Sequence, residues 1–426
     1  MTIGVFVGSL LGAMALGMPI AFALLVSSVV LMYVLGIFDS QIIAQNLISG
    51  ADSFPLLAIP FFMLAGELMN QGGLSRRIVE MAMTMVGHIR GGLGYVAIIA
   101  ALLFASISGS AVADTAALGA VLIPMMAKAG YDVNRASGLI ATGGIIAPVL
   151  PPSIGFIIFG VASGVSITKL FMAGLVPGIL MAVGLAITWA VVARKDNVAV
   201  QPRASVKEML VSLRQGIWAL FLPIIIVVGL KFGIFTPTEA AVVAAVYALF
   251  VGVVVYRELK IKDLYHVFVQ SAKMTSVVMF LVAAALVSSW LITVANLPAM
   301  VIDMLGPFLD KPLLLLIMIN LLVIVVGTAM DMTPTILILT PVLMPLVEAA
   351  GIDPVYFGVL FILNNAIGLL TPPVGTVLNV MCGVSKISME DLMKGIWPFL
   401  LVEVIILILL ILFPSLVLVP LEWFSQ

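Results

Sequence analysis

Apolar residues run along this chain in long stretches that are separated by short polar or basic segments. Many stretches approach or exceed the roughly 20 residues that an α-helix needs to cross the hydrocarbon core of a bilayer. They are continuous and lack the alternation of apolar and polar residues that is typical of membrane β-barrel strands. The pattern therefore predicts an all-α integral membrane protein.

The pattern of prolines and polar residues occurs twice. Three features recur 221 residues further along the chain (345 − 124 = 221): Pro124 as Pro345, Asp132 as Asp353, and the pair Pro151-Pro152 as Pro372-Pro373. The chain is therefore predicted to contain two repeats, residues 1–204 and 205–426.

Two apolar helices are interrupted in each repeat. In residues 313–348, two apolar pieces of about 14 residues flank a polar segment, and each piece is too short to cross a bilayer alone. We therefore expect a re-entrant helical hairpin there, and another at about 92–127. The double prolines predict broken transmembrane helices at about 134–163 and 354–382. Broken helices at matching positions of two repeats indicate the binding site of a secondary transporter.

The remaining helices are expected to form a scaffold, at 1–90 in the first repeat and about 216–292 in the second. The basic segment 194–214 should be cytoplasmic. Within it, Ser205 and Glu208 match a capping box, which predicts a short surface helix that is separate from the membrane helix starting near 216.

Charge placement also gives the direction of each repeat. Residues 263–292 should begin at the interface and cross the membrane from Val277, and the last span is expected at about 396–419. Basic residues between 76 and 90 place the first hairpin on the cytoplasmic side, opposite to the second. The repeats should therefore have inverted topology, as in elevator-type ion transporters.

The interrupted helices carry groups that suit a small, hard cation. Unwound backbone carbonyl groups coordinate Na+ in transporters of this kind, and hydroxyl oxygens can join them. A Ser or Thr at such a position can instead cap free backbone groups. The expected sodium ligands are Ser106, Ser108, Ser110, Thr142, Gly143, Gly327, Thr328, Asp331 and Thr371.

The free N–H groups on the other side of each break carry partial positive charge and suit an anion. No Lys or Arg is expected at mid-membrane depth, so a carboxylate would bind helix N-termini and hydroxyl groups. The expected substrate-binding residues are Gly109, Pro151, Ser153, Thr333, Asn365, Pro373, Gly375 and Thr376. Asn364, Asn365 and Asn379 are also expected to bridge helices.

Composition excludes several classes of function. Hydrophobic residues make up 63% of the chain and charged residues only 9%, with a net charge of −1, so nothing indicates a nucleic-acid partner. Cys382 is the only cysteine, and neither an H-E-x-x-H motif nor a P-loop occurs. We therefore expect Na+ as the only metal, no organic cofactor, and an ion gradient as the source of energy.

Four segments resemble the large membrane subunit of TRAP (tripartite ATP-independent periplasmic) transporters. They are PFFMLAGELMN at 60–70, SISGSAVADT at 106–115, PVLPPSIG at 148–155 and NNAIGLLTPPVGT at 364–376. The resemblance covers nearly the whole chain. It implies Na+-driven uptake of an organic acid, such as sialic acid or a dicarboxylate, by an elevator movement in the bacterial inner membrane.

The resemblance also implies two protein partners, a small four-helix membrane subunit and a soluble periplasmic substrate-binding protein. Because the chain starts directly in the large-subunit pattern, the small subunit is expected to be a separate chain. We do not expect an enzyme.

Three alternatives remain open at this point. A stand-alone Na+-coupled carrier for dicarboxylates or citrate would share the inverted repeats but need no binding protein. An intramembrane aspartyl protease could use Asp114 and Asp331, although its Gly-x-Gly-Asp motif is missing. These acids could also be helix caps or first-turn residues. A channel would need a continuous polar pore, which the sequence does not suggest.

Overall fold

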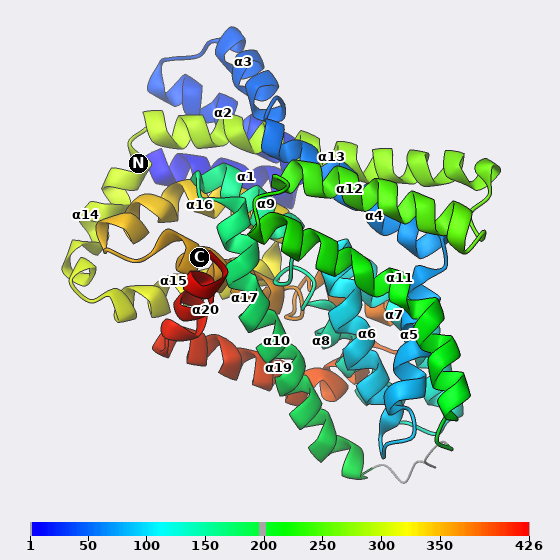
Figure 1. The fold of residues 1–426 in the computed structure, drawn as a ribbon. Helices are drawn as coiled ribbons and strands as arrows, with labels where there is room; N and C mark the ends of the chain where they lie inside the picture. The colour runs from blue at the N-terminus through cyan, green and yellow to red at the C-terminus, as the bar shows by residue number, and fades with distance from the viewer. Residues whose placement is uncertain (1, 196–201, 426) are drawn as a thin grey trace.

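The computed structural model describes residues 2–195 and 202–425 (Figure 1). Within these ranges the chain forms helices and no β-strand, which confirms the prediction of an all-α fold. The first half contains α1 (Thr2–Ala15), α2 (Ile20–Leu35), α3 (Ser40–Ala51), α4 (Ala58–Gln71), α5 (Leu74–Val86), α6 (Gly92–Ser108), α7 (Ala111–Lys128), α8 (Val133–Gly144), α9 (Ile154–Ser163) and α10 (Ile167–Val192).

The second half contains α11 (Val206–Lys231), α12 (Pro237–Phe250), α13 (Ile261–Val294), α14 (Leu297–Leu309), α15 (Pro312–Ala329), α16 (Met332–Ala349), α17 (Pro354–Gly368), α18 (Thr376–Ser385), α19 (Met389–Leu412) and α20 (Ser415–Ser425). A 3-10 turn at Phe54–Leu57 leads into α4, and a π-helical segment at Val251–Val255 extends α12. Eight helices in the described ranges are long and apolar enough to cross a membrane, or nine if the bent pair of α3 and Phe54–Gln71 counts as one span.

Helices of the two halves correspond in position and in packing. Helices α7 and α16 begin and end 221 residues apart (332 − 111 = 349 − 128 = 221), and α5 corresponds to α14 in the same order. Helix α7 packs on α18 of the other half, and its counterpart α16 packs on α9, the counterpart of α18. This reciprocal packing is what a two-fold relation between the halves requires. That the two-fold axis lies in the membrane plane stays a prediction.

Two predicted helix boundaries are wrong. The expected surface helix after Ser205 is the first part of the continuous α11, although the capping box of Ser205 and Glu208 is present. The last long apolar helix is α19 at Met389–Leu412, rather than at about 396–419. Helix α13 covers the predicted range 263–292 as one helix of 34 residues. Helix α14 was not predicted. In each case packing against neighbouring helices, which a local pattern does not contain, decides where the helix ends.

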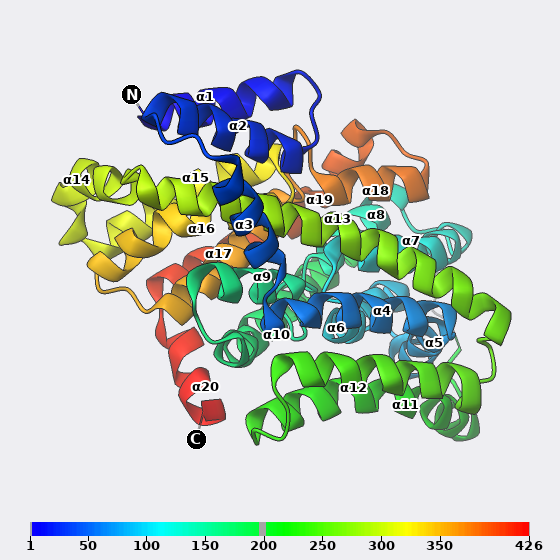
Figure 2. The same cartoon turned by 90° about the horizontal axis from the view of Figure 1, so that it is seen from above.

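Helix α13 crosses the whole molecule (Figure 2). It packs on α2, α3 and α4 of the first half and on α16 of the second hairpin. At 1.5 Å per residue its 34 residues span about 51 Å, well beyond the hydrocarbon thickness of a bilayer. Helices α8 and α17 occupy the centre, and nearly all of their residues are buried.

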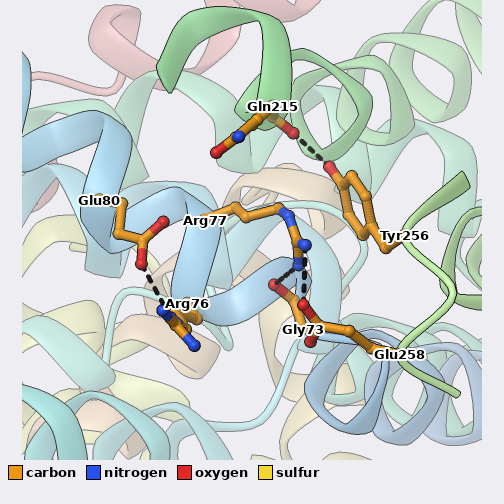
Figure 3. A network of polar contacts seen from close by, with 7 residues as sticks. All are labelled: Gly73, Arg76, Arg77, Glu80, Gln215, Tyr256 and Glu258. Carbon is orange, nitrogen blue, oxygen red and sulfur yellow. Dashed lines mark hydrogen bonds and ion pairs between the residues drawn. The ribbon is translucent and has the colours of Figure 1, made fainter. Parts of the chain in front are cut away.

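Helix α5 connects α4 to the first hairpin and is anchored at its start (Figure 3). The Arg77 guanidinium pairs with Glu258, donates to the Gly73 carbonyl oxygen at 3.0 Å and lies 3.8 Å from the Tyr256 ring centroid. The Tyr256 hydroxyl donates to the carbonyl oxygen of Gln215 on α11. The corresponding helix α14 has Pro298 at the position of Arg77, so this anchor belongs to one half only.

Candidate functional site

The tip of the first hairpin lies against the first double proline. Helix α6 ends at Ser108, and Gly109 turns the chain with φ 62° before Ser110 caps α7. A Cβ atom on Gly109 would lie 2.4 Å from the Pro152 carbonyl oxygen. Only glycine therefore allows both the left-handed turn and the close approach.

The first break is buried. Residues 145–153 join α8 to α9, and the Pro151-Pro152 peptide bond is cis. The Ser153 hydroxyl accepts a hydrogen bond from the Phe156 amide at 3.1 Å and donates to the Pro148 carbonyl oxygen. Ser153 thus closes the break on one side and caps α9 on the other.

Asp114 faces this tip from the first turn of α7. Its side chain is 2% exposed, and one carboxylate oxygen accepts a hydrogen bond from the Ser108 hydroxyl. The other oxygen is buried without a hydrogen-bond partner among the described residues. In a low-dielectric interior an unpaired charged oxygen of this kind is costly.

A cavity of about 100 Å³ separates this tip from the scaffold. It is lined by Glu67 and Asn70 of α4, by Met274 of α13, and by Ser108, Ser110 and Asp114 of the hairpin. No Lys or Arg belongs to its lining, whereas two carboxylates do. The rest of the lining is mainly apolar, so these carboxyl groups lie against an apolar surface.

The tip of the second hairpin also meets its double proline. The Val374 amide donates to the Thr328 carbonyl oxygen at 3.1 Å. The Thr376 hydroxyl donates at 3.2 Å to Asp331, the residue that precedes α16. The Pro372-Pro373 bond is cis, as in the first break, but residues 372–374 are exposed. Each break thus meets the tip of its own hairpin, but through different contacts and with a different accessibility.

A second cavity, of about 580 Å³, lies beside Asp331. Its walls are the start of α2 at residues 19–22, residues 276–281 of α13, and Asp331 with Pro334 of the hairpin. Because Met274 lines the first cavity, one segment of α13 forms part of the wall of both.

Asparagines connect the second hairpin to the second broken helix. The Asn364 amide on α17 donates to the backbone and side-chain oxygens of Asn320 on α15, at 2.8 and 2.7 Å. Asn365 is fully buried, and neither of its side-chain polar atoms has a hydrogen-bond partner in the described part of the chain. The predicted bridging role is thus correct for Asn364. Asn379 instead donates within its own broken helix, to Val374.

The predicted sodium ligands fall into two separate groups, one at each tip. Ser108 and Ser110 lie with Asp114, and Gly143 of α8 lies against Ala101 of α6. Four hydroxyls donate to a carbonyl oxygen of their own helix, which leaves oxygen lone pairs free: Ser106 to Leu103, Thr142 to Gly138, Thr328 to Val325 and Thr371 to Ile367.

The predicted substrate-binding residues also divide between the halves. Gly109, Pro151 and Ser153 belong to the first tip and break, whereas Pro373, Gly375 and Thr376 belong to the second. Thr333 lies in the first turn of α16, and Asn365 lies inside the packing of α17. Asn320 was missed, because a single polar residue in an apolar helix gives no local sign of its partner.

The sequence matches a known family of membrane proteins over most of its length. The family model described as "Tripartite ATP-independent periplasmic transporter, DctM component" matches residues 7–416. The 2,3-diketo-L-gulonate TRAP transporter large permease protein YiaN of Escherichia coli is 58% identical over 425 residues, covering 100% of both chains. The sialic acid TRAP transporter large permease protein SiaM of Vibrio cholerae is 40% identical, covering 98% of this chain and 99% of its own.

A third relative is the C4-dicarboxylate TRAP transporter large permease protein DctM of Pseudomonas aeruginosa, 36% identical over 90% of each chain. Among solved structures, the Alcanivorax borkumensis YdaH transporter has a TM-score of 0.64 at 14% identity, covering 89% of this chain and 88% of its own. At that identity the likeness supports the fold alone. The relatives are permeases rather than enzymes. The chain is therefore a multi-pass protein of the bacterial inner membrane and belongs to the DctM family of TRAP transporter large subunits.

Proposed function

We propose that this chain is the membrane subunit through which an organic acid enters the cell together with Na+. The observation that carries the proposal is the pairing of each hairpin tip with a broken helix, at Gly109 and Pro152 in one half and at Thr328 and Val374 in the other. Three relatives are named for 2,3-diketo-L-gulonate, sialic acid and C4-dicarboxylates, which are all carboxylic acids. The relative with 58% identity favours a sugar acid as the first solute to test.

The two tips supply ligands for two sodium ions. At the first tip, the hydroxyls of Ser108 and Ser110 lie beside the unpaired oxygen of Asp114. At the second, Asp331 and Thr376 are hydrogen-bonded to each other next to the exposed break. Oxygen groups from hydroxyls, carboxylates and unwound backbone suit a hard cation.

The anionic solute would bind where helices begin. Ser110, Ser153 and Gly375 are the N-caps of α7, α9 and α18, and all three lie at the tips and breaks. Backbone N–H groups and the helix dipole at such ends favour a carboxylate. Bound Na+ would offset the charge of Asp114 and Asp331, so the solute and the ion would support each other's binding.

The movement is proposed to be an elevator. Both hairpins pack on both broken helices, so the site is built from elements that must move together to keep its geometry. Cavities between this body and α4 or α13 lie where one surface would slide past the other.

The partners are proposed from the family: a small four-helix membrane subunit, and a periplasmic protein that delivers the solute. The test is uptake by vesicles that contain all three proteins, screened across sugar acids, sialic acid and C4-dicarboxylates, with and without a Na+ gradient. Uptake that is unaffected by Na+ would overturn the coupling. Uptake of free solute by this chain alone would favour the stand-alone carrier.

A further inference from the structure

We infer that Asn320 is a positioning residue for the second ion site, because its contact with Asn364 fixes the axial position of α15 relative to α17. This inference rests on the proposed Na+ coupling. Asn320 lies in the middle of α15, among the residues Leu313 to Val326, which are otherwise all apolar. It is 5% exposed and two helical turns before Gly327, so both residues lie on the same face of α15.

The side-chain nitrogen and oxygen of Asn320 both form hydrogen bonds. Its side-chain N–H donates to the Leu316 carbonyl oxygen at 2.8 Å, which turns its oxygen outward to accept from Asn364. Asn364 also donates to the Asn320 backbone oxygen, so one amide group joins α15 to α17 through two acceptors. Buried in an apolar interior, this pairing has no water to replace it. It therefore prevents α15 and α17 from sliding along each other.

The register matters because the same two helices meet again at the tip. A Cβ on Gly368 would lie 2.9 Å from the Gly327 backbone, so the helices are in close contact there. A Cβ on Gly327 would lie 3.3 Å from the Asn365 side-chain oxygen, which places this unpaired amide beside the end of α15. Asn365 follows Asn364 directly. A shift at the Asn320–Asn364 contact would therefore move the Asn365 oxygen away from Gly327.

The first half has no asparagine pair at the corresponding positions. The positions that correspond to Asn320 and Asn364 are Ile99 and Gly143 (320 − 221 = 99; 364 − 221 = 143). Gly143 instead lies against Ala101 of α6, an apolar contact. Loss of the Asn320 contact should therefore affect the second ion site and leave the first intact.

The experiment measures the Na+ concentration for half-maximal uptake in the complete transporter with Asn320→Leu, Asn364→Leu and both together. We expect each single variant to raise it about ten-fold, as loss of an outer-shell ligand partner does, and the double variant to add nothing. The KM for solute at saturating Na+ should change less than two-fold. Ser28→Ala, which removes a buried hydrogen bond to Ser288 in the scaffold, is the matched control and should leave both values unchanged.

The same variants are tested without transport, by the increase in Tm of the purified protein on adding Na+. If the wild type responds to Na+ in either assay and Asn320→Leu responds equally, the positioning role is overturned. Equal losses in Na+ and solute affinity, or additive effects of the two substitutions, would also overturn it. If the wild type shows no Na+ response at all, the proposed coupling itself fails.

Discussion

The Arg77 guanidinium on α5 lies 2.7 Å from the Glu258 carboxylate in the connection from α12 to α13. The Arg77 side chain is 17% exposed and lies over the Tyr256 ring. The neighbouring Arg76 is 76% exposed and, among the described residues, forms an ion pair only with Glu80 on its own helix. Helix α5 is thus fixed to the scaffold at the point where the chain turns toward the first hairpin.

Arg77→Gln should weaken the attachment of α5 to the scaffold. Loss of the ion pair costs about 1 kcal/mol, so hydrogen exchange in α5 should accelerate roughly five-fold while exchange in α8 stays the same. Arg76→Gln is the control and should change neither helix, because its pair is exposed. Unchanged exchange of α5 in Arg77→Gln would contradict an anchoring role.

Gly109→Ala should separate the first tip from the first break. A Cβ there would collide with the Pro152 oxygen in addition to straining a positive φ. Gly164→Ala is a matched control, because Gly164 also has a positive φ (74°) but open space around it. We expect Gly109→Ala to lower the free energy of unfolding by about 1–3 kcal/mol more than Gly164→Ala, measured by denaturant titration. Equal losses would show that the tip contact contributes nothing.

Removing hydroxyls at the tips should weaken activation by Na+. Ser108→Ala leaves the buried Asp114 carboxylate without its donor, and Thr371→Ala removes an oxygen next to the second break. Each should raise the Na+ concentration for half-maximal uptake by about ten-fold. Flux assays over a range of Na+ concentrations measure this. Identical activation curves for both variants and the wild type would reject the ligand assignments.

Cross-links should distinguish an elevator from local gating. In a Cys382→Ala background, Asn70→Cys and Ala113→Cys face one cavity from the scaffold and the hairpin. A short reducible cross-link there should abolish uptake until it is reduced. Gly119→Cys and Val384→Cys form the control pair, since a Cβ on Gly119 lies 3.1 Å from Val384 within the proposed moving body. That link should leave transport intact, and a block by both links would contradict rigid-body movement.

The sequence predicted the parts of the fold that local chemistry determines. The double prolines interrupt helices wherever they occur, so the breaks after Gly144 and Gly368 follow from the residues themselves. The capping box at Ser205 was also identified correctly, but whether the helix that follows continues into the membrane depends on packing along α5 and α10.

Contacts between distant residues were beyond prediction from one sequence. The partner of Asn364 is 44 residues away on another helix, and no local pattern in either helix shows that the two helices meet there. Likewise, α4 lies between α12 and the first hairpin and lines the cavity, although no local pattern pairs these segments. A periodic pattern identifies a buried face but not the surface that covers it.

The length of α13 makes the protein sensitive to the membrane around it. A helix of about 51 Å in a hydrocarbon layer of about 30 Å must either tilt or leave the layer at one end. A thicker or thinner bilayer therefore changes the tilt of α13, at a cost of fractions of a kcal/mol for each ångström of mismatch. Because Met274 lines the first cavity and residues 276–281 line the second, we expect lipid chain length to change the space between the two sides of the transporter.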